Sequence, residues 1–178
     1  MTKKPFDPDI ESIREQARDD IERGAVTDAY RADRRNVVDL LNRALATELV
    51  CMLRYKHHQF MSKGLQAEVA AYEFREHATQ EQEHADQIAA RIVQLGGKPD
   101  FMPDTLRERS HADYVEGKTL TDMLEEDLVA ERIAIGAYGE MIRYLGDDDP
   151  TTRRLLESIL ATEEEHADDL ANLLAESS

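Results

Sequence analysis

The 178-residue sequence is poor in helix-breaking residues, sulfur ligands and aromatic side chains. It holds eight glycines, five prolines, one cysteine and no tryptophan. The single cysteine, Cys51, excludes an intramolecular disulfide and any metal site built on paired cysteines. Because glycine and proline are scarce and the residues that favour strands are not enriched, the composition predicts long helices rather than β-sheets. The length suits one domain with a substantial core.

Long hydrophobic runs are also missing. No apolar stretch approaches the ~18 residues that a membrane-spanning helix needs. The first seven residues, Met-Thr-Lys-Lys-Pro-Phe-Asp, lack the apolar segment of a secretory signal. We therefore expect no membrane partner and a cytoplasmic location.

Positive charge is outweighed by negative charge. The formal net charge is −16 at pH 7. An acidic surface repels phosphate backbones and attracts cations, so no nucleic-acid partner is expected. The only candidate for a basic arm, Lys3-Lys4, is too short to reverse that expectation.

What the sequence does contain is helical periodicity. It predicts four long helices near residues 36–62, 67–95, 119–146 and 150–174. The intervening segment 97–117 is a long connection. A helix of about 27 residues is about 40 Å long, so this connection is long enough to return the chain to the far end of the preceding helix. The pattern indicates an all-α fold, a four-helix bundle with one long crossover between its second and third helices.

The predicted helix ends carry suitable capping residues. Asp33, Thr119 and Asp149 are candidate N-caps, with Pro150 at the first position of the last helix. Gly64 and the pair Gly96-Gly97 are candidate stops.

Residues 1–35 form a predicted extension ahead of the bundle, which spans residues 36–178. Ile10, Ile13, Ala17 and Ile21 recur at helical spacing, which favours a short amphipathic helix. A frayed terminus is an equally acceptable interpretation.

The two halves of the bundle repeat one motif. The first helix of each half has a glutamate followed seven residues later by a tyrosine, and the second helix has Glu-x-x-His. The glutamates of the two motifs are separated by nearly the same number of residues in both halves. The motif residues are Glu48, Tyr55, Glu81 and His84 in one half and Glu131, Tyr138, Glu163 and His166 in the other.

The repeat predicts a metal site. Residues at i and i+3 lie on one helix face, so each Glu-x-x-His pair can bind one ion. The motif glutamates also interrupt the apolar stripes of their helices, where an uncompensated buried charge costs several kcal/mol. Two divalent cations would neutralise four carboxylates. The alternative is that these glutamates are solvated and the predicted helical phase is wrong. The candidate ligands are Glu48, Glu81, His84, Glu131, Glu163 and His166.

The donor set favours iron or manganese. Carboxylates with one imidazole per metal suit these ions better than structural zinc, although zinc remains a possible occupant.

Several neighbouring residues are candidates for supporting roles. Asp127 lies one turn before Glu131 and can accept a hydrogen bond from a ligand histidine, or can be a surface residue. Tyr55 and Tyr138 can hydrogen-bond a ligand carboxylate or supply an electron, or can simply be core aromatics. His77 lies one turn after Glu73 and can belong to a third metal position. His57, His58 and His111 show no partner pattern and are expected at the surface.

Together these motifs resemble those of bacterioferritin. The matching segments are Asn42 to Val50 through Tyr55 and His58, Glu81 to Asp86 through Pro99, Asp127 to Glu131, and Ile159 to His166. The resemblance covers residues 36–174 and implies a ferritin-like bundle. It also implies two iron ions per subunit, with Glu48 and Glu131 as terminal ligands and with Glu81 and Glu163 bridging. His84 and His166 would each bind one iron.

The sequence departs from the bacterioferritin pattern at three places. Gln82 stands where haem-binding members have methionine, so no haem is expected. Glu76 and Gln80 stand where some members have a histidine and an aspartate for an inner-surface iron site. The N-terminal extension and the long crossover look more like Dps-like proteins with a bacterioferritin-type site, which form shells of twelve subunits rather than twenty-four.

The resemblance implies a ferroxidase that oxidises Fe²⁺ with O₂ or H₂O₂ and stores iron in a homo-oligomeric shell of twelve or twenty-four subunits. Three alternatives remain. The chain can be a peroxide-protecting Dps-like protein, a di-iron or di-manganese oxidase that forms no shell, or a helical module without metal chemistry.

Overall fold

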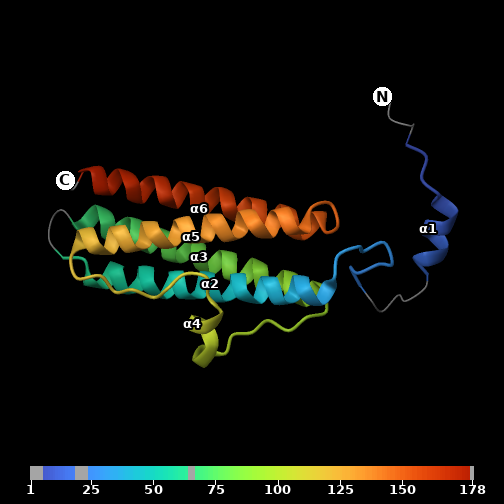
Figure 1. Ribbon diagram of the computed structural model, residues 1–178, viewed down its shortest axis with the longest axis horizontal. Coiled ribbons are helices and arrows are strands. Elements are labelled where there is room, and N and C mark those ends of the chain that lie inside the picture. The colour runs from blue at the N-terminus through green and yellow to red at the C-terminus, as the bar shows by residue number, and fades with distance from the viewer. Residues whose placement is uncertain (1–5, 19–23, 64–66, 177–178) are drawn as a thin grey trace.

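A computed structural model describes residues 6–18, 24–63 and 67–176, and in these ranges every regular element is helical (Figure 1). Lys3, Lys4, Ile21 and Gly64, which the sequence singled out, lie outside the described residues. The elements are α1 (Ile10–Gln16), α2 (Arg34–Met61), α3 (Ala67–Gln94), the 3-10 turn η2 (Pro103–Thr105), α4 (Leu106–Arg109), α5 (Leu120–Leu145) and α6 (Pro150–Glu176).

The four long helices lie side by side as an elongated bundle (Figure 1). Helix α2 pairs with α3 and α5 pairs with α6, while α2 also contacts α5 and α3 contacts α6. Each pair is an antiparallel hairpin, and the chain passes from the end of α3 to the opposite end of the bundle before α5 begins. The all-α bundle with one crossover between its second and third long helices is therefore confirmed.

The predicted caps account for where three helices begin. The Asp33 side chain accepts hydrogen bonds from two backbone N–H groups of the first turn of α2. Thr119 and Asp122 form a capping box at the start of α5. At α6, the Asp149 carboxylate accepts a hydrogen bond from the Thr152 N–H at 2.9 Å, and Pro150 occupies the first helical position.

Two glycines follow the C-terminal end of α3, beside the start of α2. Gly96 has a φ of +72°, a backbone conformation that residues with a Cβ rarely adopt. At Gly97, a Cβ would lie only 2.7 Å from the Val38 side chain. The tight exit from α3 therefore depends on both positions.

The crossover is anchored along α2. Its two short helical turns, η2 and α4, were not predicted from the sequence, and α4 packs against α2. Asn42 accepts a hydrogen bond from the Asp100 N–H at 2.8 Å, and its carbonyl oxygen accepts one from Arg109 at 3.2 Å. These contacts keep a long irregular segment in place.

The interior contains two apolar clusters separated along the bundle axis. The larger, which includes Leu41, Ile88 and Leu156, fills the end near the start of α2. The smaller includes Phe74, Leu124 and Leu170 at the opposite end. The buried polar residues lie between these two clusters, so apolar side chains pack on both sides of the predicted metal site.

Helix α1 lies beyond the end of the bundle and buries none of its residues (Figure 1). Ile10 and Ile13, the predicted apolar face, are 46% and 52% exposed. None of the described helices is long and apolar enough to cross a membrane.

Candidate metal centre

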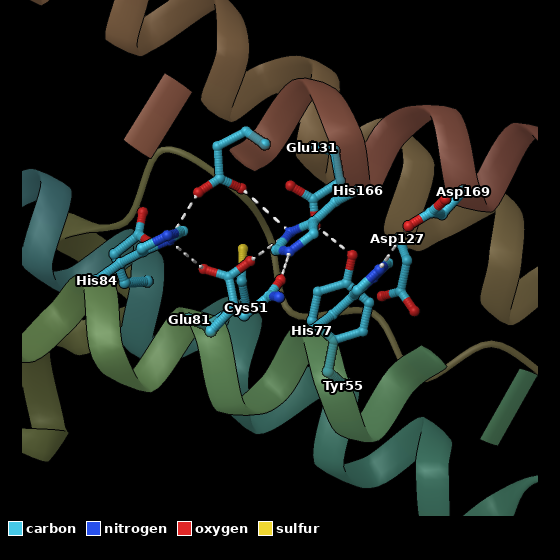
Figure 2. A network of polar contacts seen from close by, with 12 residues as sticks. Cys51, Tyr55, His77, Glu81, His84, Asp127, Glu131, His166 and Asp169 are labelled. Carbon is cyan, nitrogen blue, oxygen red and sulfur yellow. Dashed lines mark hydrogen bonds and ion pairs between the residues drawn. The ribbon is translucent and has the colours of Figure 1, made fainter. Parts of the chain in front are cut away.

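The six predicted ligand residues come together in one buried cluster at mid-bundle (Figure 2). Each long helix contributes, because the motif residues fall on the helix faces that meet at the bundle axis. Five of the side chains are at most 1% exposed, and His84 is 6% exposed. The solvated alternative is therefore wrong for these residues.

The cluster consists of two overlapping groups that share Glu81 and Glu163. Within each group, one ligand atom per residue lies within 4.8 Å of all the others. In each group the four ligands come from three helices and surround one point, so they can hold a single cation. The groups are Glu48, Glu81, His84 and Glu163, and Glu81, Glu131, Glu163 and His166.

The histidines direct the same ring atom into the cluster. His84 Nδ1 lies 3.1 Å from Glu48 and 3.0 Å from Glu163. His166 Nδ1 lies 3.5 Å from Glu81 and 3.7 Å from Glu163. The shared glutamates therefore face both imidazoles, which is the arrangement that bridging ligands require.

Burial and mutual repulsion perturb the acid–base behaviour of the cluster. Desolvation, and then the charge of Glu163, raise the pKa of Glu81 well above its usual value. The pKa values of Glu131 and Glu163 are raised chiefly by the same desolvation. Burial lowers the pKa of His84, but hydrogen bonds to Glu163 and Glu48 outweigh that effect and raise it from 6.5 to about 10. Without a metal, the cluster retains protons.

Several buried ligand atoms have no hydrogen-bond partner among the described residues. They include Glu81 Oε1, Glu131 Oε2 and His166 Nδ1, and all belong to the cluster. An unsatisfied buried polar atom costs about 1–3 kcal/mol. Cations at the two positions would satisfy these atoms and replace the protons, so the residues present fit a pair of metal ions.

The two motif tyrosines contact the glutamates across the bundle. The Tyr55 hydroxyl on α2 donates to Glu131 on α5, and the Tyr138 hydroxyl on α5 donates to Glu48 on α2. Both rings are fully buried. The reciprocal pair reproduces the internal repeat as an approximate two-fold arrangement.

Asp127 does not contact a ligand histidine, contrary to the expected role. Its Oδ1 accepts from Arg54 Nε at 2.6 Å, and its Oδ2 lies 2.7 Å from His58 Nδ1. All three side chains are at most 1% exposed. The expectation that His58 lies at the surface is therefore wrong, because a buried carboxylate and the Glu116 carbonyl, 2.9 Å away, satisfy both of its ring nitrogens.

The contacts of other neighbouring residues were not predicted from the sequence. Gln80 Oε1 lies 2.5 Å from His166 Nε2, so this glutamine orients the histidine and leaves Nδ1 facing the cluster. Its position one residue before Glu81 was the available signal. His111 was expected at the surface but is half-buried, with its Nδ1 2.9 Å from the Thr47 hydroxyl. His57 is partly exposed.

Taken together, a four-helix bundle with one crossover and a buried carboxylate–histidine cluster is the arrangement of ferritin-like carboxylate proteins. The family model of the ferritin-like domain matches residues 38–178. The chain belongs to the ferritin-like family.

The chain's relatives include bacterioferritins, a stress-induced DNA-binding protein and a DNA protection during starvation protein. Bacterioferritin from Rhodobacter capsulatus is 32% identical over 134 residues, which cover 74% of this chain and 78% of the relative. The nutrient stress-induced DNA-binding protein of a Synechococcus strain is 33% identical over 140 residues, covering 76% and 78%.

A solved structure shows the same relationship. The bacterioferritin-related protein of Bacteroides fragilis, a dodecameric thioferritin, superposes with a TM-score of 0.79 and 32% identity. The match covers 82% of this chain and 88% of the other. The expected ferritin-like fold and its bacterioferritin and Dps relatives are therefore confirmed.

Proposed function

We propose that this protein is a ferroxidase that oxidises Fe²⁺ at the buried cluster and stores iron within a homo-oligomeric shell. Family membership and the relationship to bacterioferritins support iron oxidation and storage. The observation that carries the proposal is the pair of overlapping ligand groups sharing Glu81 and Glu163.

The six residues have distinct proposed roles. Glu48 with His84, and Glu131 with His166, each hold one ion, and the two shared glutamates bridge the pair. Two divalent ions balance four ionised carboxylates, so filling the site removes the repulsion that raises the carboxylate pKa values. Iron is the proposed occupant, and manganese or zinc can compete for the same donors.

The oxidation requires two electrons per oxidant molecule, which two ferrous ions supply. They reduce one H₂O₂ to two waters, or one O₂ to H₂O₂, with uptake of two protons. The chain's own residues hold the two ions close together. Tyr138 and Tyr55 fix the outer carboxylates of Glu48 and Glu131 by hydrogen bonds. The apolar clusters on both sides limit access of bulk water.

The test is an anaerobic Fe²⁺ titration followed by addition of oxidant. The wild-type protein should bind about two ions per chain with high affinity and oxidise them rapidly. Glu81→Gln should lower the initial oxidation rate by at least about 100-fold, because both ions lose a shared ligand. Glu83→Gln is the matched control, since Glu83 is exposed and two residues away. Equal rates for Glu81→Gln and wild type would contradict the proposal.

The oxidant separates two forms of this function. The relationship to a DNA protection during starvation protein of Pyrococcus furiosus gives a reason to test a peroxide-protecting role. Stopped-flow oxidation with H₂O₂ and with O₂ at equal concentrations distinguishes them. A strong preference for H₂O₂ indicates peroxide consumption with storage as a consequence, and comparable rates indicate storage as the main role.

Haem is not part of the proposal. Gln82 is only partly exposed, and its amide donates to Asp86 at 3.2 Å on the same helix. This side chain offers no thioether sulfur for an axial bond to haem iron. Purified protein should therefore lack the Soret absorption of a haem protein.

A further inference from the structure

A second cluster of metal-binding side chains lies next to the proposed centre, towards the α6 C-terminus. Glu73 and His77 are one turn apart on α3. Asp169 projects from α6 one turn after His166, towards His77 (Figure 2). One ligand atom from each of the three lies within 4.8 Å of the others. None of them belongs to the two groups of the buried centre.

His77 is the residue that indicates a ligand here. Its side chain is only 2% exposed, and neither ring nitrogen has a hydrogen-bond partner among the described residues. The Asp169 Oδ2 atom lies 3.6 Å from Nε2, which is beyond hydrogen-bond distance. Leaving a buried imidazole unsatisfied is costly, and a bound cation would offset that cost.

Aromatic contacts hold the His77 ring in place. It stacks on the His166 ring with centroids 4.0 Å apart, and the Tyr55 ring lies nearly perpendicular to it with centroids 5.2 Å apart. The imidazole is thus oriented before any ion arrives, with one nitrogen facing Asp169 (Figure 2). Preorganisation of this kind lowers the cost of binding.

The two carboxylates supply charge and access. The Asp169 side chain is 53% exposed and Glu73 is half-buried, so the cluster is accessible to solvent. The pKa of Glu73 is raised by partial burial and then by the charges of Asp169 and Glu76. A divalent cation between the carboxylates would relieve that repulsion.

We propose that Glu73, His77 and Asp169 bind a third divalent transition-metal ion, at a solvent-accessible position one imidazole ring away from the buried pair. The imidazole favours Fe²⁺, Mn²⁺, Co²⁺ or Zn²⁺ over Mg²⁺ and Ca²⁺, which prefer oxygen ligands throughout. With three protein ligands and an open side, this ion exchanges faster than the two enclosed by the bundle.

The decisive experiment is anomalous scattering from crystals of the full chain soaked with Co²⁺. The wild-type protein should show three peaks per chain, one of them between His77 and Asp169. The double variant Glu73→Gln, Asp169→Asn should lose that peak and keep the other two. Asp168→Asn is the matched control, because Asp168 is exposed, adjacent and outside the cluster.

Solution binding provides an independent measurement. Equilibrium dialysis against Co²⁺ should give three ions per wild-type chain and two for the double variant. In the double variant, the dissociation constant of the third position should rise at least about tenfold above the wild-type value. His77→Phe keeps the stacked ring but removes both nitrogens, and should also bind two. Circular dichroism checks that each variant is folded.

The outcomes separate this inference from the proposed function. Two filled positions at the buried centre and no third peak at saturating Co²⁺ would overturn the inference alone. A filled third position with an empty centre would support the inference and contradict the ferroxidase proposal. If Asp168→Asn lost the third peak as the double variant does, general attraction to negative charge would explain the binding. That result would also overturn the inference.

Discussion

At the scale of single residues, the site combines candidate ligands with side chains that hold them in place. Each motif tyrosine contacts the glutamate of the other hairpin, Tyr55 with Glu131 and Tyr138 with Glu48. A carboxylate held in this way has fewer orientations when the metal arrives. We therefore expect the tyrosines to contribute to metal affinity without being ligands.

Removing one of these hydroxyls should weaken metal binding. Tyr138→Phe keeps the ring and deletes the hydrogen bond to Glu48. We expect the metal affinity of the position that uses Glu48 to fall roughly 10- to 100-fold. Isothermal titration with Co²⁺ measures it. Tyr144→Phe, at an exposed position on the same helix, should bind like wild type. Unchanged affinity in Tyr138→Phe would show that the hydroxyl has no holding role.

The perturbed acid–base groups predict how stability varies with pH. In metal-free protein the pKa values of Glu81, Glu131 and Glu163 are raised by burial, and that of His84 is raised to about 10. A group whose pKa is higher in the folded than in the unfolded protein stabilises the fold. This contribution is fully present below the unfolded pKa and is lost as the pH rises through the folded pKa. Above pH 6.5 the groups act in the same direction.

Metal-free protein should therefore lose stability between pH 6.5 and 8.5, and added Mn²⁺ should restore more stability at the higher pH. Urea unfolding in EDTA and in Mn²⁺ at both pH values gives the four free energies needed. Glu81→Gln should flatten the slope measured in EDTA. A metal-free protein that becomes more stable over this range would contradict the assignment of protons to the cluster.

The six metal-binding candidates could be selected from the sequence because each one interrupts an apolar helical stripe, and helical spacing then decides which residues share a face. The partners of Asp127 could not be selected in this way. Spacing within α5 brings Asp127 close to Glu131, but it does not say which residues of α2 lie opposite. Arg54 and His58 meet it only after two helices pack, and one sequence contains no signal for that register.

At the scale of elements, Arg54, His58 and Asp127 form a buried triad that connects the first hairpin, the second hairpin and the crossover. Arg54 and His58 project from α2 and Asp127 from α5, while Arg54 also donates to the Asp113 carbonyl at 2.9 Å. His58 bonds the Glu116 carbonyl in the same segment. The end of the crossover is thus tied to the helices that it joins.

Breaking the triad should be costly. Asp127→Ala leaves the Arg54 charge buried without its carboxylate, and truncating one partner of such a pair typically costs about 3–5 kcal/mol. Chemical unfolding measures the change. The control is Glu125→Ala, because Glu125 is exposed on the same helix and should change stability by less than about 0.5 kcal/mol. If Asp127→Ala lowered the free energy of unfolding by less than about 1 kcal/mol, the triad would contribute little net stability.

The elements themselves were largely predictable, since caps and glycines define the ends of long periodic segments. Thr119 with Asp122 and Asp149 with Pro150 locate the starts of α5 and α6 almost to the residue. The short turns within the crossover were not, because Asn42 and Arg109 hold that segment by contacts between residues far apart in the chain. Such contacts leave no local pattern.

At the scale of the whole molecule, the chain presents many large apolar side chains to its surroundings. Phe60, Tyr72, Val93 and Tyr144 are each more than half exposed on the long helices. A single chain in water gains nothing from this exposure, whereas a shell covers it between subunits. This feature accords with the proposed homo-oligomer.

Particle mass tests the assembly directly. One chain has a mass of 20.3 kDa, so a shell of twelve would have about 240 kDa and one of twenty-four about 490 kDa. Light scattering coupled to size exclusion distinguishes them. We expect twelve, because the twelve-subunit Bacteroides fragilis protein superposes with a TM-score of 0.79. A monomer or dimer would contradict the shell and favour an oxidase acting on an organic substrate.

The approximate two-fold arrangement of the centre ends at its histidines. His166 bonds Gln80 and stacks on His77, whereas His84 is 6% exposed and bonds two glutamates instead. Because the two histidines have different surroundings, iron nuclei at the two positions would experience different electric field gradients. Mössbauer spectra of protein loaded with two ⁵⁷Fe per chain should then resolve two quadrupole doublets of equal area rather than one.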